Sequence, residues 1–440
     1  MGPVTVLLSA LLVVACGLKY PSVAIAQQHN DSVRVSRTNP WHAAAGVLVL
    51  NVLPWAYDWY VEHWSWANIG TRAWKENFRL GFAWDDNSFR DNQLAHPYHG
   101  SLYYHSARAS GFGFWGSLPF VAAGSAGWEY LFENERPSLN DLVNTTLGGM
   151  ALGEVTFRLS SLLGLGARRA PFARQAGAFA LSPIGRTQAL IHGRYPELES
   201  NPELRKDDEG WLALGSQSGH PYVTLSYQSG NAFTDQPIRP YDVFEFAMQL
   251  GPQPDATVRE IGISGLLARR DLRRSSRSHV ALGLYQHYDY LDVPGLKMSD
   301  QGLSGALLYQ RRLGPRTQLR LNTHLEAVLL GAVSSEYGHA WLRDYDYGSG
   351  GGGRLATVLR RDGRDLVRFD ARMVWLHSWH GADADHLAVS WRLGTAVRLG
   401  HLFGVGGDIG ATNRSSWYAG LPAVSHRVRE TRAYLIWPTE

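Results

Sequence analysis

The sequence predicts an α+β protein in which an N-terminal helical module precedes an antiparallel transmembrane β-barrel of about twelve strands. Three observations lead to this prediction. Apolar runs and helix-capping signals occupy the first part of the chain, a regular apolar–polar alternation begins near residue 210, and tight-turn residues separate the alternating segments. The chain of 440 residues is long enough for both parts.

An export signal is predicted at the start of the chain. The apolar run "VTVLLSALLVV" has the length of a signal-peptide core, and Ala24 and Ala26 form an A-x-A cleavage site. We therefore expect residues 1–26 to be a signal peptide and residues 27–40 to be a flexible N-terminus. The alternative is lipidation of Cys16, because "VVAC" is similar to a lipobox. The chain has 1 cysteine, so we expect no disulfide and no zinc–thiolate site.

Residues 41–165 are predicted to form the helical module. Its clearest helix spans residues 137–164, where Ser138 and Asp141 form a capping box that places negative charge at the positive end of the helix dipole. Glu154 and Arg158 are spaced as an i,i+4 ion pair. Residues 43–53, "AAAGVLVLNVL", are shorter than the ~18 apolar residues of a spanning helix and are predicted to be a core helix.

The segment of residues 96–117, "HPYHGSLYYHSARASGFGFWGS", has the residue types that catalysis needs. A histidine there could act as general base toward a serine nucleophile, with a carboxylate that orients the histidine. The candidate catalytic residues are His96, His99, Ser101, Glu129, Glu133 and Asp141. The chain has neither a G-x-S-x-G elbow nor an H-E-x-x-H helix. We expect no cofactor, and no metal site, since "WDDNSFRDN" lacks the glycine and glutamate of a calcium loop.

A structural role for the same polar residues is the alternative. Buried polar side chains must form hydrogen bonds, and a seam between the module and the barrel lumen would satisfy them. Glu129 and Glu133, one turn apart if helical, would raise each other's pKa, or would face Arg108, Arg136 or solvent. The candidate binding residues are Tyr98, Tyr103, Tyr104, Arg108 and Asn144 in the module and Arg320, Arg368, Arg372 and Arg392 in the barrel.

Residues 166–209 are rich in proline, glycine and basic residues and are predicted to be a linker, with at most one short helix. Residues 210–440 are predicted to form the barrel. In residues 318–329, leucines alternate with polar residues such as Arg320 and Glu326, which gives one apolar and one polar face. Asp362-Gly363 and Gly314-Pro315 mark tight turns. Segments near the ~10 residues of a tilted spanning strand favour a membrane barrel over a soluble sandwich.

The ordered series "WDDNSFRDNQLAHPYHGSLYYHSAR" and "GFGFWGSLPFVAAGSAGWEYLFENERPSLNDLVNTTLGGMALGEVTFRLS", over residues 84–160, resembles the bacterial family called domain of unknown function 3943. The resemblance implies a Gram-negative envelope protein whose helical module precedes an outer-membrane β-barrel. The family carries no established activity, so the resemblance assigns no catalytic residue.

Composition narrows the functional classes. Charged residues make up 18% of the chain and its net charge is +3, which argues against a nucleic-acid partner. We expect the outer membrane as location, with a periplasmic or lumen-embedded module, and outer-membrane lipids as partners, including lipopolysaccharide or phospholipid. The oligomeric state stays open. Three functions are considered: a barrel in envelope structure, transport or lipid handling; an envelope lipid- or glycan-modifying hydrolase that uses His96 and His99; and a soluble exported carbohydrate-binding β-protein.

Overall fold

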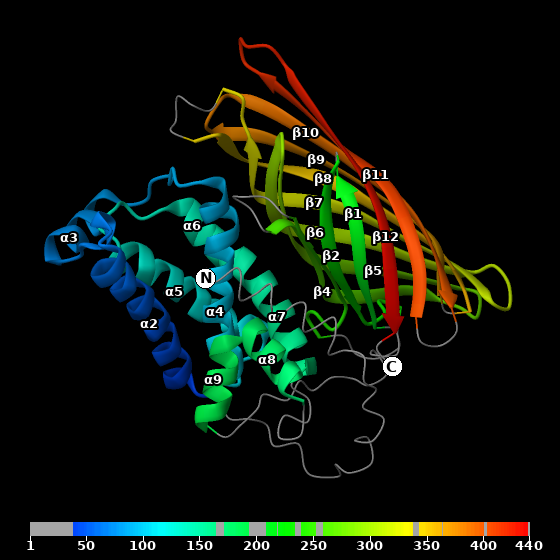
Figure 1. Ribbon diagram of the computed structural model, residues 1–440, viewed down its shortest axis with the longest axis horizontal. Helices are drawn as coiled ribbons and strands as arrows, with labels where there is room; N and C mark the ends of the chain where they lie inside the picture. The colour runs from blue at the N-terminus through cyan, green and yellow to red at the C-terminus, as the bar shows by residue number, and fades with distance from the viewer. Residues whose placement is uncertain are drawn as a thin grey trace. The chain divides into compact units, whose positions relative to one another are not determined.

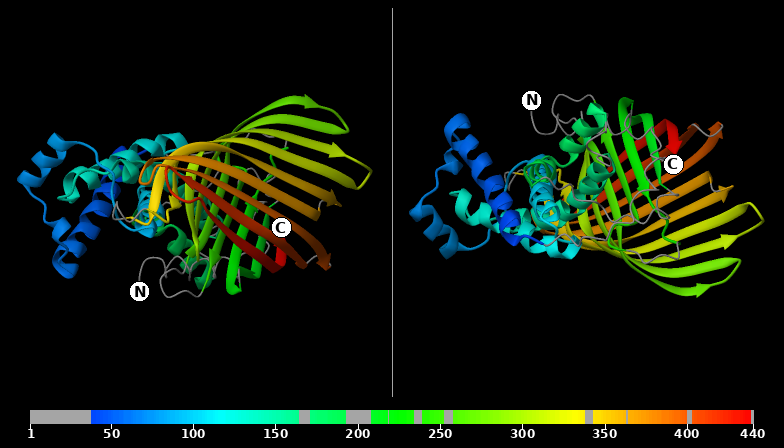
Figure 2. Two further views of the ribbon diagram at one scale, coloured as in Figure 1. Left: turned by 90° about the horizontal axis from the view of Figure 1, so that it is seen from above. Right: turned by 90° about the horizontal axis from the view of Figure 1, so that it is seen from below.

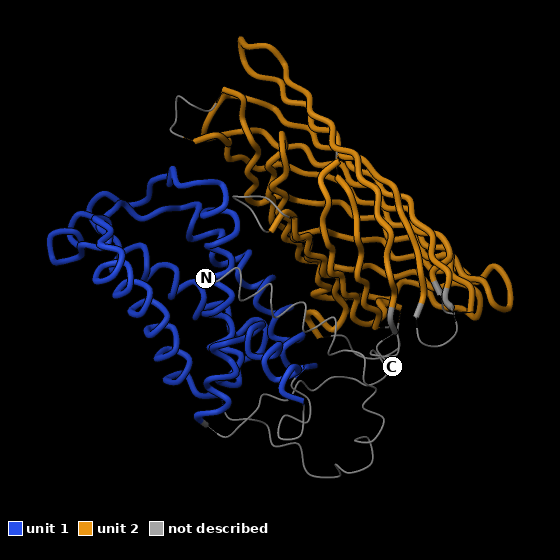
Figure 3. Tube along the Cα trace, viewed as in Figure 1, with its two compact units in different colours: residues 1–199 blue, residues 200–440 orange. Residues whose placement is uncertain are grey.

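The computed structural model describes residues 38–163, 171–192, 208–217, 219–233, 239–251, 258–337, 343–362, 364–399 and 403–438. The chain divides into two compact units, residues 1–199 and residues 200–440 (Figure 3). The predicted signal peptide, Cys16 and most of the predicted flexible N-terminus lie outside the described residues.

The first unit is helical. Its α-helices are α2 (Pro40–Tyr57), α3 (Thr71–Leu80), α4 (His96–Ala109), α5 (Phe114–Gly127), α6 (Leu139–Val143), α7 (Gly149–Leu163), α8 (Phe172–Leu181) and α9 (Pro183–His192) (Figure 1). Wider π-helical turns occur at Asp58–Glu62, Asp91–Ala95, Trp128–Phe132 and Asn144–Gly148, and a 3-10 turn at Ser65–Ala67. Within the described residues, no helix is both long enough and apolar enough to cross a membrane.

Helix α4 is the centre of the helical unit and packs against α2, α5, α7 and α9. The approach to α7 is possible because both helices carry glycine where they meet: a Cβ on Gly149 would lie 2.6 Å from the Cα of Gly100. The close approach brings the first turn of α4 beside the segment that follows Asp141.

The predicted helix of residues 137–164 forms with one modification. The hydroxyl of Ser138 accepts a hydrogen bond from the backbone N–H of Asp141 at 3.3 Å, as a helix cap does. The helix then continues as α6, the π-helical turn Asn144–Gly148 and α7. Such a turn admits an extra residue, which shifts the side chains beyond it around the helix axis.

The described part of the predicted linker, within residues 166–209, contains two helices rather than one. Helices α8 and α9 lie within it, and α8 packs against α7 while α9 packs against α4. Ala178, Leu181 and Ala189 are buried, so small apolar side chains among the basic residues give both helices a core-facing side.

The second unit is a closed barrel of 12 antiparallel strands in which every strand pairs with its sequence neighbours and β1 pairs with β12 (Figure 2). The strands are β1 (Glu209–Gln217), β2 (His220–Ser229), β3 (Phe244–Leu250), β4 (Val258–Arg274), β5 (Ser278–Val293), β6 (Leu296–Arg312), β7 (Thr317–Ser334), β8 (Tyr345–Arg361), β9 (Arg364–His380), β10 (Ala384–Leu399), β11 (Phe403–Tyr418) and β12 (Val424–Pro438). The predicted fold class and strand number are confirmed.

The turn predictions are also confirmed. Arg361 of β8 pairs with Arg364 of β9, so these strands are joined by the tight hairpin that the sequence predicted at Asp362, while Gly363 lies outside the described residues. Asp362 has φ of 52°, the left-handed conformation that such a loop requires. Gly314 and Pro315 lie in the turn between β6 and β7.

The two faces of the barrel wall follow the predicted alternation. On β7, Leu325 is 78% exposed, whereas its neighbour Glu326 is 4% exposed because it faces the lumen. Other strands repeat this arrangement. The large exposed apolar residues of the outer face include Leu282, Leu284, Leu303, Leu307, Leu329, Met373, Trp375, Val389, Leu393, Val397, Val405, Ile409 and Leu435. The lumen receives the charged residues.

Candidate functional site

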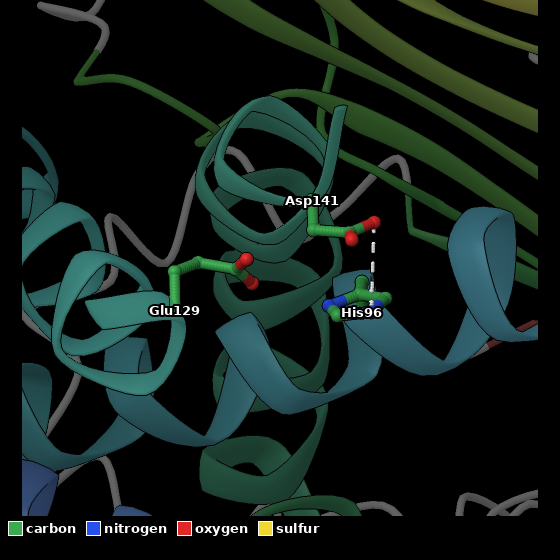
Figure 4. Close-up of side chains that lie close together, drawn as sticks. All are labelled: His96, Glu129 and Asp141. Carbon is green, nitrogen blue, oxygen red and sulfur yellow. Dashed lines mark ion pairs between the residues drawn. The ribbon is translucent and has the colours of Figure 1, made fainter. Parts of the chain in front are cut away.

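A polar cluster in the helical unit unites three candidate residues from three separate segments. His96 begins α4, Glu129 lies in the π-helical turn after α5, and Asp141 lies in α6 (Figure 4). The Nε2 atom of His96 is 3.5 Å from Oδ1 of Asp141. One ring nitrogen of His96 and one carboxylate oxygen each of Glu129 and Asp141 all lie within 4.8 Å of one another. Glu129 and Asp141 are buried, and His96 is half-buried.

Neighbouring groups hold each of these side chains. The other ring nitrogen of His96, Nδ1, lies 3.2 Å from Oγ1 of Thr145. The backbone N–H of Ser138 donates to Oε2 of Glu129 at 2.7 Å, and the side-chain amide of Asn140 donates to Oδ1 of Asp141 at 2.8 Å. The cluster is therefore ordered by residues of the helix start that the sequence predicted.

Negative charge in the cluster is poorly compensated. Burial raises the pKa of Glu129 well above its usual range, and the carboxyls of Glu133 and Asp141 raise it further. Burial and then Asp141 raise the pKa of Glu133 to about 8, although the indole N–H of Trp128 donates to Glu133 and lowers it. Burial raises the pKa of Asp141 to about 6, against the opposing effect of His96. The predicted effect of Glu133 on the pKa of Glu129 is thus present.

The two arginines that were alternative partners of these carboxyls bind elsewhere. Arg108 forms an ion pair with Glu154 at 3.0 Å. Arg136 donates to the backbone carbonyls of Leu80 and Phe82 at 3.1 Å and 2.9 Å.

His99 and Ser101 lie outside the cluster. Nε2 of His99 is 3.1 Å from the carbonyl oxygen of Leu50, and its ring lies between Tyr103 and Trp128, at centroid distances of 4.6 Å and 5.3 Å. Burial lowers the pKa of His99 to about 4. The hydroxyl of Ser101 donates to the carbonyl oxygen of Tyr98 at 2.6 Å. With these contacts, His99 and Ser101 do not form the hydrogen bond that joins a nucleophilic serine to its general base.

The remaining candidates of the module support the packing of α4. Tyr103 is fully buried and donates to the side-chain oxygen of Asn51. Tyr104 donates to Glu154 at 2.7 Å, and Glu154 also pairs with Arg158 at 2.7 Å, as predicted. Asn144 donates its amide to the carbonyl oxygen of Asn92 at 2.8 Å.

The barrel lumen contains a second charged group, which we call the central network: Asp289, Asp300, Glu326, Arg354 and Arg372, contributed by β5, β6, β7, β8 and β9. Arg372 contacts Asp289 at 3.1 Å, Asp300 at 2.6 Å and Glu326 at 2.8 Å. Arg354 contacts Asp289 at 3.2 Å and Glu326 at 3.1 Å. Three carboxylates thus share two guanidinium groups.

The other predicted arginines also have partners within the barrel. Arg368 pairs with Asp370 at 2.8 Å and Glu245 at 3.2 Å. Arg392 pairs with Glu430 at 2.6 Å. Arg320 donates to Gln310 at 2.9 Å and its guanidinium lies 5.6 Å from the ring centre of Phe233. The sequence identified these arginines but missed their acidic partners, although the alternation of residues 318–329 had placed Glu326 on the polar face of its strand.

The lumen encloses a cavity of about 450 Å³. Its lining includes Asp289, Asp300, Arg354 and Arg372 of the network, together with Arg320, Arg368, Arg392 and Glu430. At one end the lining reaches Met298, Val374 and Val428. These three belong to a buried cluster that we call the apolar layer: Val293, Leu296, Met298, Val328, Val333, Val374, Leu376 and Val428. β6 and β12 are opposite each other in a ring of 12 strands, so a cluster that includes Met298 and Val428 crosses the lumen.

The comparisons with known proteins agree with the sequence resemblance. Residues 81–184 match the model of a family described as Domain of unknown function (DUF3943), which confirms the resemblance seen over residues 84–160. No curated protein matches the chain.

Several solved β-barrels resemble the chain at low sequence identity. The CymD monoaromatic hydrocarbon channel is 12% identical, with coverage of 52% of this chain and 87% of CymD, at a TM-score of 0.24. The outer membrane protein Omp33 of Acinetobacter baumannii is 10% identical, with coverage of 54% and 99%, at a TM-score of 0.23. The toluene transporter TodX of Pseudomonas putida is 10% identical, with coverage of 52% and 88%, at a TM-score of 0.23.

Proposed function

We propose, from the premise that residues 81–184 form a domain of the DUF3943 family, that the chain is an outer-membrane β-barrel protein of the Gram-negative envelope whose lumen is a gated path for small polar solutes. The observation that carries this proposal is a charged lumen cavity of about 450 Å³ inside a closed barrel, with the apolar layer at one end.

The outer surface of the barrel supports a membrane location. Large apolar side chains such as Leu325, Trp375 and Ile409 point away from the lumen and are exposed. Exposed apolar surface of this extent is unfavourable in water, and a closed barrel is the β-structure that satisfies all its backbone hydrogen bonds in lipid. Lipopolysaccharide or phospholipid acyl chains are the partners that we propose for this surface. A soluble carbohydrate-binding protein would have no need of such an exposed apolar outer surface.

The lumen supports transport of polar solutes. Its arginines and carboxylates are paired with one another, so the cavity wall is polar and overall close to neutral. Water and small polar solutes are compatible with such a wall. The apolar layer is a different environment, because water leaves a narrow apolar constriction and ions do not cross it. We propose that this layer is the closed gate.

The helical module is proposed to lie on the periplasmic side. Glu209, where β1 begins, pairs with Pro438, at the end of β12, so both ends of the barrel sequence lie on the same rim. The module directly precedes β1 in the chain. The chain therefore does not have to cross the barrel for the module to lie on the side of the rim where β1 begins.

The hydrolase alternative has weaker support. His96 has the carboxylate partner that a general base needs, but Ser101 and His99 form their hydrogen bonds with backbone carbonyls. The Ser101→Ala variant tests the hydrolase alternative by comparison of envelope lipid composition with and without the protein. If the wild type changes this composition and a folded Ser101→Ala protein does not, the result would favour the hydrolase over the gated path.

Conductance of the purified protein in planar bilayers tests the gate. We expect the wild type to be closed for most of the recording and Val374→Ser together with Leu376→Ser to raise the open fraction, since hydroxyl groups hydrate the constriction. Met373→Ser is the matched control, because Met373 directly precedes Val374 on the same strand, lies on the outer face and is 51% exposed. Equal conductance of both folded variants would refute the gate, and recovery of the wild type in the soluble periplasm would refute the membrane location.

A further inference from the structure

We propose that His96, Glu129 and Asp141 bind one divalent transition-metal ion in the helical unit, with zinc as the first probe. This site is separate from the barrel lumen and does not depend on the proposed transport function. The sequence predicted no metal site, because its three ligands come from segments that are up to 45 residues apart.

The donor set fits such an ion. An imidazole nitrogen and two carboxylate oxygens are ligands that zinc and manganese accept, whereas calcium and magnesium prefer oxygen alone. Ligand atoms of a tetrahedral zinc site lie about 2.0–2.2 Å from the ion and therefore ~3.4 Å from one another. The three donor atoms of the cluster are within 4.8 Å of each other, so side-chain shifts of about 1 Å would complete the site.

The groups behind the ligands are arranged as in metal sites. A metal-binding histidine presents one ring nitrogen to the ion and holds the other in a hydrogen bond that fixes its tautomer. Nδ1 of His96 contacts Thr145 at 3.2 Å, which leaves Nε2 directed toward Asp141. Ser138 and Asn140 in turn hold one oxygen of each carboxylate.

Charge balance also favours a cation. Buried carboxylates are normally paired with a basic group or bound to a metal. The charged groups with the largest effect on Glu129 are Glu133, Asp141 and Asp85, all acidic, and Arg108 and Arg136 bind elsewhere. His96 is the basic side chain that the described residues place against Asp141.

A second observation points to a ligand beside Glu129. The hydroxyl of Ser125, a residue only 2% exposed, has no hydrogen-bond partner among the described residues. Ser125 lies in the last turn of α5, four positions before Glu129 in the π-helical turn that follows. A buried hydroxyl without a partner is unfavourable, and a water bound to the metal ion would supply one.

The backbone around His96, Glu129 and Thr145 is unusual as well. His96 directly follows the π-helical turn Asp91–Ala95, Glu129 lies within the turn Trp128–Phe132, and Thr145 lies within the turn Asn144–Gly148. Such turns occur frequently at functional sites, because the extra residue redirects a side chain that a regular helix would place elsewhere. Here one turn precedes the ligand His96, one contains the ligand Glu129, and one contains Thr145, which contacts Nδ1 of His96.

The experiment measures zinc bound to the purified full-length chain after removal of metal with a chelator. We expect one equivalent of zinc in the wild type, and at least a tenfold weaker affinity in His96→Gln, Glu129→Gln and Asp141→Asn. Glu76→Gln is the matched control, because Glu76 has a 45% exposed side chain on α3 and pairs only with nearby Arg72 in the described part of the chain. The control should bind zinc as the wild type does.

Two outcomes would overturn the proposal. One is equal zinc binding by the wild type and all three ligand variants, which would place the metal elsewhere. The other comes from the wild type alone and does not depend on whether the variants fold: an X-ray absorption spectrum of the zinc-loaded protein without an imidazole ligand. A spectrum with one imidazole and oxygen ligands supports the site.

Discussion

Replacement of Arg372 by methionine tests the central network of the lumen. Arg372 contacts three carboxylates, and the side chains of two of them, Asp300 and Glu326, are only 1% exposed. Methionine keeps the apolar stem of the arginine and removes its charge. The substitution leaves Arg354 as the one guanidinium for the three carboxylates of the network.

The expected loss of stability follows from this geometry. Removal of one partner from a buried ion pair costs about 3–5 kcal/mol, mostly because the other charge remains buried without compensation. Arg372 itself is 16% exposed and Asp289 is 25% exposed, so water screens part of the effect. We therefore expect a destabilisation near ~3 kcal/mol, at the lower end of this range.

Urea unfolding of the barrel, refolded into detergent or lipid and followed by tryptophan fluorescence, measures the effect. Arg361→Met is the control, because Arg361 is exposed at the end of β8 and its substitution should change the free energy of unfolding by less than ~0.5 kcal/mol. A destabilisation of Arg372→Met as small as that of the control would refute the account of the network. Addition of Asp300→Asn should recover part of the loss, as expected for residues that interact directly.

Three further predictions concern other parts of the chain. Glu154→Gln should lower the stability of the helical unit by about 3 kcal/mol, because Arg108 and Arg158 lose a fully buried carboxylate. Hydrogen exchange of the backbone amides of α4 and α7 measures this loss, and unchanged protection in the variant would contradict the prediction. Burial lowers the pKa of His105 from 6.5 to about 4, so the stability that neutral His105 contributes is present above pH 6.5 and is lost as the pH falls toward 4. Between these pH values the free energy of unfolding of the His105→Asn variant should therefore fall by about 3 kcal/mol less than that of the wild type. Hydrogen exchange measured against pH tests this, and parallel profiles for the two proteins would argue against it. Leu325→Arg, at the 78% exposed outer position of β7, should destabilise the barrel in lipid by about 2–4 kcal/mol and leave conductance through the lumen unchanged. Urea unfolding measures the first effect, and conductance in planar bilayers measures the second.

Strand alternation was the most informative signal in the sequence. The polar positions of residues 318–329 were predicted to face one side, and the structure places Glu326 in the lumen and Leu325 outside. Register follows from this alternation because a shift by one residue would move every leucine of the strand into the lumen. The hairpin at Asp362 and the cap at Ser138 were predictable for a similar reason, since each depends on residues adjacent in sequence.

The helical unit was predicted less completely. A π-helical turn depends on how neighbouring helices pack, so no local pattern indicated the turns that precede His96 and contain Glu129. The helices α8 and α9 were missed in part because glycine, proline and arginine in residues 166–209 are typical of linkers. Their few small apolar residues gain burial only once α4 and α7 are in place.

The sequence by itself determined the helical module, the strand number and the side of each strand that faces the lumen, because caps, turns and alternation are properties of neighbouring residues. Only the tertiary structure decided which charged residues meet. His96 joins Glu129 and Asp141 while His99 turns to a backbone carbonyl, and Arg372 joins three carboxylates from three other strands. Helix packing and barrel closure fix these distances, since they bring together residues that are far apart in the chain.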